Sequence, residues 1–598
     1  MANLMSPIRP RSSLVCRAVI LWLVTGLSGL ALVSGCTILA QPVRSIQESL
    51  FAERSTVHET QQQQHELPPA DFEQDTLYNL LVAEMAAYNQ RFDLTLSHYL
   101  QEARKTRDPG LVARAYDVAS VLRVRQVATE MAELWLSIEP DNSEAVKAHA
   151  VEQVWAGDID AAMPAMIDVK RKTGEAPFFF VATQAVELSE DARDQLIANY
   201  RTWLKNWPDD RSLKIGLALL IHQQGDLDNA LKQLELMIAA GESDATVVRL
   251  KGLLLIELKR SEQAVTVLRE GLDKYPDDLR IRLLYGRLLL KDGDLTGAQR
   301  EFEVLVAQQP QNPELLVTVG LISMENGMPG QAGLYFYRLA EIPGQADVAN
   351  FYLGRLAQQM DDWKEGRKYF LKVEPGSQFL PAYVALTRML ADREYWDLMA
   401  DDLEKARKSY PDYAPELYLI EGEVMEEQRS YDKANGIFNR ALIKYPDNIE
   451  LLYARAMLAE RFDDLRGLEN DVRKILQKEP DHAAALNALG YTLADRGLRL
   501  AEAKELIIKA YKIQPDDASI MDSMGWIEYR LGNHNLALVY LRQAYKRFED
   551  AEVAAHLGEV LWALGLKKEA VKIWSEALER QPDSEVLRST VERLRVTW

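Results

Sequence analysis

The sequence predicts an all-α solenoid, in which a helix-turn-helix unit is repeated along most of the 598-residue chain. Prolines recur at a fixed interval: Pro276 and Pro310 are 34 residues apart, as are Pro446 and Pro480, and Pro515 follows after 35 residues. Small and bulky residues recur at the same interval between the prolines. A fixed period of this size is typical of stacked repeats, because each unit buries its apolar face against its neighbours.

Small residues and one bulky residue occupy fixed positions within each period. In the unit that begins at Pro415, Gly422 stands at position 8, Ala434 at position 20 and Phe438 at position 24. Small residues at 8 and 20 let two helices approach closely, and the bulky residue at 24 fills the space toward the next unit. The units that begin at Leu279, Ala518 and Ala551 carry the same pattern: Gly286, Ala298 and Phe302; Gly525, Ala537, Leu541 and Ala544; Gly558, Ala570, Trp574 and Ala577.

This pattern closely resembles that of the tetratricopeptide repeat (TPR) family. The resemblance implies a right-handed TPR superhelical solenoid of about fifteen helix-turn-helix repeats over residues 71–584, with a C-terminal capping helix over 585–598. Units near residues 177, 380 and 448 fit less well, so each is expected to be a bend or a shift of the repeat frame. The concave groove of a TPR superhelix is lined by the first helix of each unit, mainly at positions 2, 5, 9 and 12.

The amino-terminal residues follow the order of a secretory signal, which is basic, then apolar, then small. Three arginines precede an apolar run of 16 residues from Ala18 to Val33, and "SGC" follows. "VSGC" resembles the lipobox of bacterial lipoproteins, which implies that residues 1–35 are a signal peptide and that Cys36 carries acyl chains, including palmitate. An uncleaved membrane anchor is the alternative, although 16 residues are marginal for a hydrocarbon layer that takes about 20.

The net charge of −20 becomes −23 without the three leader arginines. An acidic surface does not favour nucleic acid or anionic lipid, so attachment to a membrane is expected to come from the lipid on Cys36. The residue after Cys36 is Thr37 rather than aspartate. By resemblance to sorted lipoproteins, this favours the outer membrane over the inner one, with the protein facing the periplasm.

Residues 36–70 are predicted to be a lipid-anchored linker, because they contain a run of four glutamines and a Leu-Pro-Pro-Ala boundary. Within this linker, residues 44–59 could form a short amphipathic helix that becomes ordered on a partner. A mostly unfolded linker without a docking role is the alternative. The apolar residues of the predicted partner-docking helix are Ile46, Leu50, Phe51 and Val57.

No catalytic motif is found in the sequence. The eight histidines are scattered, and no H-E-x-x-H, G-x-S-x-G or Walker A pattern occurs. The repeats cover almost the whole chain after the linker, which leaves no room for a separate catalytic domain. We therefore expect no catalytic residue, no metal site and no cofactor, and a function that depends on the surface of the repeats.

Aromatic residues are concentrated in the last repeats and are predicted to line a partner-binding groove. Aromatic rings on a concave face are suited to binding unfolded or extended protein. The alternative is that the repeat frame is shifted and these rings belong to the core. An acidic stripe of Glu423, Glu426 and Glu427 lies just upstream. The predicted groove residues are Tyr491, Trp526, Tyr529 and Trp562.

The lipobox, the linker and the near-continuous repeats together resemble outer-membrane TPR lipoproteins that act as adaptors for periplasmic carboxyl-terminal processing proteases. The resemblance implies a scaffold that recruits and activates such a serine protease and presents peptidoglycan hydrolases to it. TPR motifs bind many partners, so the motifs themselves do not specify this role. The alternative is a structural lipoprotein of an envelope secretion machine, such as one for polysaccharide export.

Overall fold

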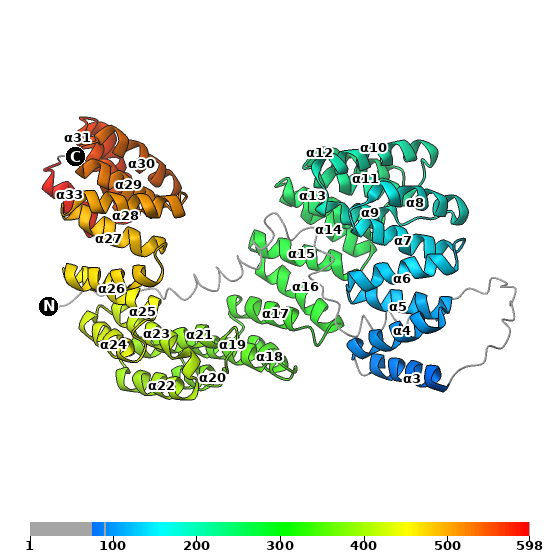
Figure 1. Cartoon of the computed structure of the whole chain (residues 1–598), viewed down its shortest axis with the longest axis horizontal. Coiled ribbons are helices and arrows are strands. Elements are labelled where there is room, and N and C mark those ends of the chain that lie inside the picture. The colour runs from blue at the N-terminus through cyan, green and yellow to red at the C-terminus, as the bar shows by residue number, and fades with distance from the viewer. Residues whose placement is uncertain (1–73, 89–90, 597–598) are drawn as a thin grey trace. The chain divides into compact units, whose positions relative to one another are not determined.

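The computed structural model describes residues 74–88 and 91–596, and these residues form 31 α-helices and no β-strand. Successive helices form fifteen antiparallel helix-turn-helix pairs, from α3 to α32, and the single helix α33 follows them. This arrangement confirms the predicted all-α solenoid of about fifteen repeats. The helices belong to two compact units, which divide between Ile342 and Pro343 (Figure 1).

The first unit contains eight helix pairs, and each pair stacks on the next (Figure 1). A short 3₁₀ turn, Ala185–Glu187, follows α9. The bounds of its helices are α3 Gln74–Tyr88, α4 Phe92–Thr106, α5 Pro109–Val121, α6 Arg125–Ile138, α7 Ser143–Trp155, α8 Ile159–Thr173, α9 Phe178–Gln184, α10 Glu190–Asn206, α11 Arg211–Gln223, α12 Leu227–Ala239, α13 Ala245–Glu257, α14 Ser261–Lys274, α15 Leu279–Asp292, α16 Leu295–Gln308, α17 Pro313–Glu325 and α18 Pro329–Ala340.

The second unit contains seven helix pairs and the final helix. A second 3₁₀ turn, Pro411–Tyr413, precedes α23. The bounds of its helices are α19 Ala346–Gln359, α20 Trp363–Phe370, α21 Phe379–Ala391, α22 Trp396–Ser409, α23 Ala414–Glu427, α24 Tyr431–Lys444, α25 Ile449–Arg461, α26 Leu465–Lys478, α27 Ala483–Asp495, α28 Leu500–Ile513, α29 Ala518–Arg530, α30 His534–Arg547, α31 Ala551–Ala563, α32 Lys567–Arg580 and α33 Glu585–Arg593.

The recurring prolines mark the boundary between one repeat and the next. The residue two positions after each proline caps the following helix: Asp278, which follows Pro276, accepts a hydrogen bond of 2.8 Å from the backbone N–H of Ile281. Asn448, which follows Pro446, caps α25 in the same way. A side-chain oxygen at this position satisfies an N–H group that the first turn of the helix leaves unpaired. The cap therefore fixes where the first helix begins in these repeats, whereas α9, α19, α21 and α23 begin without a side-chain cap.

The residues predicted to pack the two helices of a repeat are buried. Phe438 and Trp574 are fully buried, and Phe302 is 2% exposed. A Cβ atom added to Gly422 would overlap the ring of Phe438, and one added to Gly558 would overlap Trp574. The small residue at position 8 is therefore required by the bulky residue at position 24 of the same repeat, whereas the sequence pattern predicted that this bulky residue faces the next unit.

The three units that fit the repeat pattern less well differ in their structure. Near residue 177, the first helix α9 has only seven residues and continues into the 3₁₀ turn. Near residue 380, it is the preceding helix α20 that is short, with eight residues. The unit near residue 448 is regular, and its frame begins one residue later at Ile449, which places the fully buried Ala456 at position 8.

The carboxyl-terminal helix α33 buries Leu587 and Val591 against the last repeat. The predicted signal peptide (1–35) and linker (36–70) lie outside the described residues. Within residues 74–88 and 91–596, no helix combines the length and apolar character that crossing a membrane requires.

Candidate partner-binding groove

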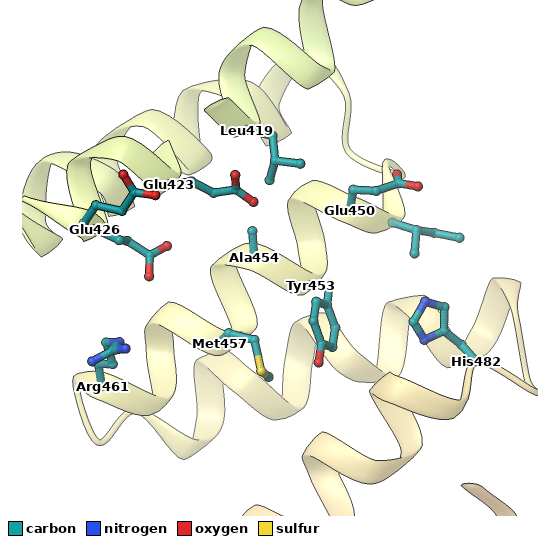
Figure 2. A pocket seen from close by; sticks show the side chains of 11 residues that line it. Leu419, Glu423, Glu426, Glu450, Tyr453, Ala454, Met457, Arg461 and His482 are labelled. Atoms are coloured by element: carbon teal, nitrogen blue, oxygen red, sulfur yellow. The ribbon is translucent and has the colours of Figure 1, made fainter. Parts of the chain in front are cut away.

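An open groove lies on the second unit, where helices α23 and α25 and the start of α27 face it (Figure 2). Its volume is about 630 Å³, which lies within the range of about 300–1,000 Å³ typical of ligand pockets. We refer to it as the acidic groove. It is lined by Leu419, Glu423, Glu426, Glu427, Ile449, Glu450, Tyr453, Ala454, Met457, Arg461 and His482.

The acidic groove occupies the repeat positions predicted for a concave TPR face. Counted from Pro415 and from Ile449, Leu419 and Tyr453 both stand at position 5 of their units. Glu423 and Met457 stand at position 9 by the same count. Because stacked repeats bring equivalent positions of neighbouring first helices together, these side chains form one continuous surface.

One end of the acidic groove is mainly apolar and aromatic, and Glu450 is the one carboxylate of the lining at this end (Figure 2). Figure 2 shows Tyr453 and His482 at this end, and their ring centres are 6.1 Å apart. His482 also caps α27, because its Nδ1 accepts a hydrogen bond of 3.1 Å from the backbone N–H of Ala485. This bond fixes the imidazole at the mouth of the groove. Leu419, Ile449 and Met457 complete the apolar lining.

The other end carries carboxylates that are incompletely paired. Arg388 donates from Nε to Glu427 at 2.9 Å and forms an ion pair with it. The side chains of Glu423 and Glu426 make no hydrogen bond or ion pair with any residue of the described chain. Arg461 lies at this end as well (Figure 2). The lining as a whole holds four glutamates against this one arginine.

The surroundings of Glu423 and Glu426 disfavour their charged forms. Partial burial raises the pKa of Glu423, the neighbouring carboxylate of Glu427 raises it further, and Arg388 opposes the shift. Partial burial also raises the pKa of Glu426, with Arg461 opposing and Glu423 adding to the shift. Like charges and loss of water both act in this direction. Ionisation of these two carboxyl groups is therefore only partly offset by Arg388 and Arg461.

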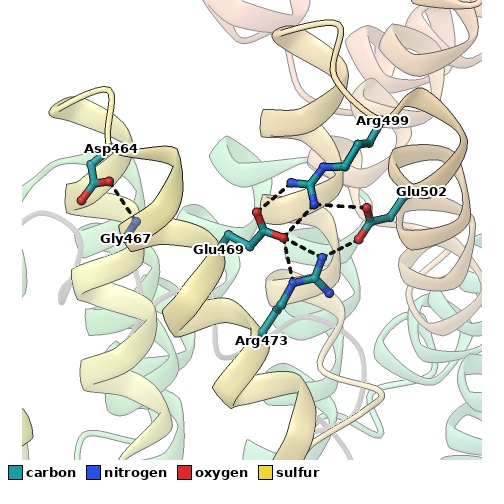
Figure 3. Close-up of polar contacts among 6 residues, drawn as sticks. All are labelled: Asp464, Gly467, Glu469, Arg473, Arg499 and Glu502. Atoms are coloured by element: carbon teal, nitrogen blue, oxygen red, sulfur yellow. Dashed lines mark hydrogen bonds and ion pairs between the residues drawn. The ribbon is translucent and has the colours of Figure 1, made fainter.

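A nearby cluster in the same unit shows the opposite arrangement (Figure 3). Arg499 of the α27–α28 turn donates two hydrogen bonds to Glu469 of α26, at 2.9 and 2.7 Å. Arg473 donates to Glu469 at 2.8 Å and to Glu502 of α28 at 2.6 Å. The bond from Arg499 is the largest cause that lowers the pKa of Glu469 to about 2. These carboxylates connect one repeat to the next and are not available to a ligand.

The aromatic residues predicted to line a groove are packed together, and this corrects the prediction for Trp526. Its side chain is only 5% exposed, its ring stacks on His556 with centroids 4.0 Å apart, and its Nε1 donates to Asp495 at 3.1 Å. Tyr491 donates from its hydroxyl to Glu552 at 2.5 Å. Since Tyr491 is on α27 and Glu552 on α31, this bond closes the face between first helices two repeats apart.

Tyr529 and Trp562 also pack against neighbours. The half-buried Tyr529 lies 5.2 Å from the Trp526 ring and donates from its hydroxyl to Glu559 at 3.2 Å. Trp562 packs against Trp574, with centroids 5.9 Å apart. Tyr491 and Trp526 thus pack on His556, and Tyr529 packs on Trp526. We refer to Tyr491, Trp526, Tyr529, Asp522 and His556 as the closed cluster.

The closed cluster is held by a buried acid–base pair. His556 is 5% exposed, and its Nδ1 lies 2.8 Å from a carboxylate oxygen of Asp522. Burial lowers the pKa of His556, but the charge and hydrogen bond of Asp522 raise it, and the net shift is upward. Sequence reasoning missed this pair, although 34 residues is one repeat period and stacking brings such positions of neighbouring first helices together. It did find the acidic stripe that proves to line the open groove.

The remaining site predictions lie outside the described residues. These are the lipidation of Cys36 and the docking helix with Ile46, Leu50, Phe51 and Val57. Among the residues that the structure does describe, no three His, Cys, Asp or Glu side chains are grouped so that they could hold a metal ion.

Family models agree with the repeat architecture. Tetratricopeptide repeat models match residues 191–245, 255–316 and 523–585. Among solved structures, the Naa15/Naa10 complex bound to HypK-THB is similar with a TM-score of 0.39 and 12% identity, over 88% of this chain and 86% of that chain. PilW, a type IV pilus biogenesis factor, is similar with a TM-score of 0.30 and 20% identity, over 36% of this chain and 100% of its own.

Two curated relatives are similar in sequence. Cellulose synthase operon protein C of Pseudomonas fluorescens is 22% identical over 453 residues, which cover 71% of this chain but only 35% of the relative. A TPR repeat-containing protein of Pseudomonas aeruginosa is 41% identical over 523 residues, and the match covers 88% of each chain. With the repeated helix pairs described above, this relationship shows that the chain belongs to the family of TPR repeat-containing proteins.

Proposed function

We propose that the protein is a non-enzymatic scaffold that is anchored by a lipid on Cys36 to the outer membrane and binds proteins in the periplasm. The observation that carries this proposal is the acidic groove, which lies open on a surface that TPR folds use for protein partners. The predicted lipobox and linker supply the anchor and the spacing from the membrane. Protein binding through TPR surfaces is the common property of the family.

The scaffold acts as an adaptor that recruits and activates a carboxyl-terminal processing serine protease and presents cell-wall hydrolases to it. An adaptor needs one surface for the enzyme and another for the client. The acidic groove is the surface for the client. Residues 44–59 are the surface for the protease, because their apolar side chains stand outside every repeat and suit a helix-in-groove interaction.

Affinity isolation from solubilised envelopes tests the adaptor role. The full-length protein is expected to retain a serine protease together with peptidoglycan hydrolases. A variant with Glu423→Gln and Glu426→Gln is expected to keep the protease and lose hydrolases, because only the client surface is altered. If neither class of protein is retained by the unaltered chain, the adaptor proposal is wrong.

A structural role in an envelope secretion machine is the second candidate. The similarity to cellulose synthase operon protein C favours it, although that match covers only 35% of the relative. In the same isolation experiment, this role predicts an outer-membrane barrel protein in place of the protease and hydrolases.

The lipid anchor is tested by substitution of Cys36. A Cys36→Ser variant lacks the thiol that the diacylglyceryl group requires, so the precursor is expected to remain uncut by the lipoprotein peptidase. Metabolic labelling with a fatty acid, followed by fractionation, provides the measurement. Label on the serine variant, or wild-type protein in the soluble fraction, would contradict lipidation at this residue.

A further inference from the structure

We propose that the acidic groove binds an extended segment of a client protein in which lysine or arginine side chains stand beside apolar ones. This inference rests on the proposed client-binding function and specifies the chemistry of the client. It is drawn from the charge balance of the groove, from its apolar end and from its extent over neighbouring repeats.

The charge balance favours a positively charged group from outside the groove. Glu427 is already paired with Arg388, whereas Glu423 and Glu426 have no hydrogen bond or ion pair among the described residues. These adjacent carboxylates repel each other, and Glu426, which is partly buried, has lost part of its hydration, whereas Glu423 is exposed. A lysine or arginine side chain placed between them would relieve both costs, as complementary charges do at protein interfaces.

The apolar end of the groove indicates that the ligand presents apolar side chains as well as charged ones. Tyr453 and Met457 lie one repeat away from Leu419 and Glu423 on the same continuous surface. An aromatic ring and a flexible thioether can accommodate aliphatic side chains of varied shape. The groove therefore offers apolar contacts and carboxylates side by side, which suits a segment whose side chains alternate between the two kinds.

The extent of the groove favours a polypeptide over a small cation. The lining residues come from two first helices and from the start of a third, and the volume is about 630 Å³. A free inorganic cation would leave most of this space empty. An extended chain spans several repeats and places successive side chains along them, as in other peptide-binding grooves.

The same charges disfavour other polymers. The chain carries a net charge of −20, and the groove lining itself holds more glutamates than arginines. Nucleic acid, anionic lipid and acidic peptides would all be repelled from such a surface. A basic segment is the one class of protein ligand that both the overall charge and the local charge attract.

The test uses the full-length protein in non-ionic detergent and three fluorescent twelve-residue peptides. Each peptide alternates leucine with one other residue, which is arginine, glutamine or glutamate. The arginine peptide is expected to bind about tenfold more tightly than the glutamine peptide, and the glutamate peptide more weakly still. Fluorescence anisotropy gives the affinities, and added salt is expected to reduce this preference.

Two double variants locate the site. Glu423→Gln with Glu426→Gln is expected to weaken binding of the arginine peptide by about tenfold and to leave binding of the glutamine peptide unchanged. Glu505→Gln with Glu579→Gln removes the same net charge from exposed positions on α28 and α32, outside the groove, and is expected to leave both affinities unchanged.

Three outcomes would overturn the inference. The arginine peptide binds no better than the glutamate peptide, the groove variant binds it as tightly as the wild type, or spermidine displaces it as effectively as a leucine-arginine competitor. The proposed function is judged separately, by capture of hydrolases from envelopes. Capture that persists unchanged in the groove variant rejects only the inference, whereas no capture by the wild type rejects the client-binding role itself.

Discussion

The acidic groove and the closed cluster lie at equivalent repeat positions of the same unit, yet only the groove is open. Position 9 is Glu423 and Met457 in the groove, and it is Tyr491 and Trp526 in the closed cluster. In the cluster, the large rings and the bond from Tyr491 to Glu552 join first helices across the concave face. In the groove, smaller or charged side chains leave the space between the first helices unfilled.

The difference teaches that concave repeat positions serve two purposes in this chain. Where they are aromatic, they pack and hydrogen-bond with each other and stabilise the stack of repeats. Where they are acidic and aliphatic, they remain available to a ligand. Aromatic content alone is therefore a poor guide to the binding surface of a TPR solenoid, and the pairing of each side chain with its neighbours is a better one.

Truncation of an aromatic side chain is expected to give the largest difference in stability between the closed cluster and the acidic groove. Trp526→Ala is expected to lower the free energy of unfolding of the second unit by about 3–5 kcal/mol, because it empties a site between His556 and the core. Tyr453→Ala in the acidic groove is the matched control and is expected to cost less than half as much, since its ring is only partly buried. Urea denaturation followed by circular dichroism measures both. Equal losses would mean that the two regions do not differ in packing.

A smaller effect is expected behind the acidic groove, where α23 packs on α24. Gly422→Ala places a methyl group against the Phe438 ring and is expected to cost about 1–3 kcal/mol. Gly436→Ala on α24 is the matched control, because the nearest atom to its added Cβ would be the end of the Arg440 side chain at 3.9 Å. The control is expected to stabilise by up to about 1 kcal/mol through higher helix propensity. A Gly422→Ala variant as stable as the control would contradict the packing argument.

The smallest change in stability is expected when paired or unpaired carboxylates are replaced. Glu469→Gln removes a charge held by Arg473 and Arg499 and is expected to destabilise by about 1 kcal/mol, since the cluster is partly screened by solvent. Glu423→Gln with Glu426→Gln is expected to leave stability unchanged or raise it by about 0.5 kcal/mol, because it relieves repulsion. Denaturation at pH 7 gives both values. A destabilised groove variant would show that these carboxylates have a structural partner.

The same two variants should differ in their dependence on pH. The lowered pKa of Glu469, about 2, means that its stabilising contribution is present above about pH 4.5 and is lost as pH falls toward 2. The raised pKa values of Glu423 and Glu426 have the opposite sign, so the destabilisation they cause appears as pH rises through about 4.5. Each substitution is expected to remove the pH dependence of stability that the replaced carboxylate causes.

The repeated fold could be predicted from the sequence because its causes are local. Gly422 and Phe438 are 16 residues apart within one helix pair, and Asn448 caps α25 two residues after Pro446. Whether the concave face is open or closed at a given repeat could not be predicted in this way. Tyr491 and Glu552 are 61 residues apart, and their contact depends on how first helices two repeats apart are placed in space. The same repeat position is therefore open in one place and closed in another.

The division between an enzyme surface and a client surface is tested most directly by deletion of residues 44–59 from the full-length protein. Burial of Ile46, Leu50 and Phe51 in the protease would contribute roughly 1.5–3 kcal/mol each, less the cost of ordering the segment. The deletion is expected to abolish protease binding and stimulation in a purified assay while hydrolase binding through the acidic groove remains. Normal stimulation by the deleted protein would contradict this division and would place the protease on the repeats.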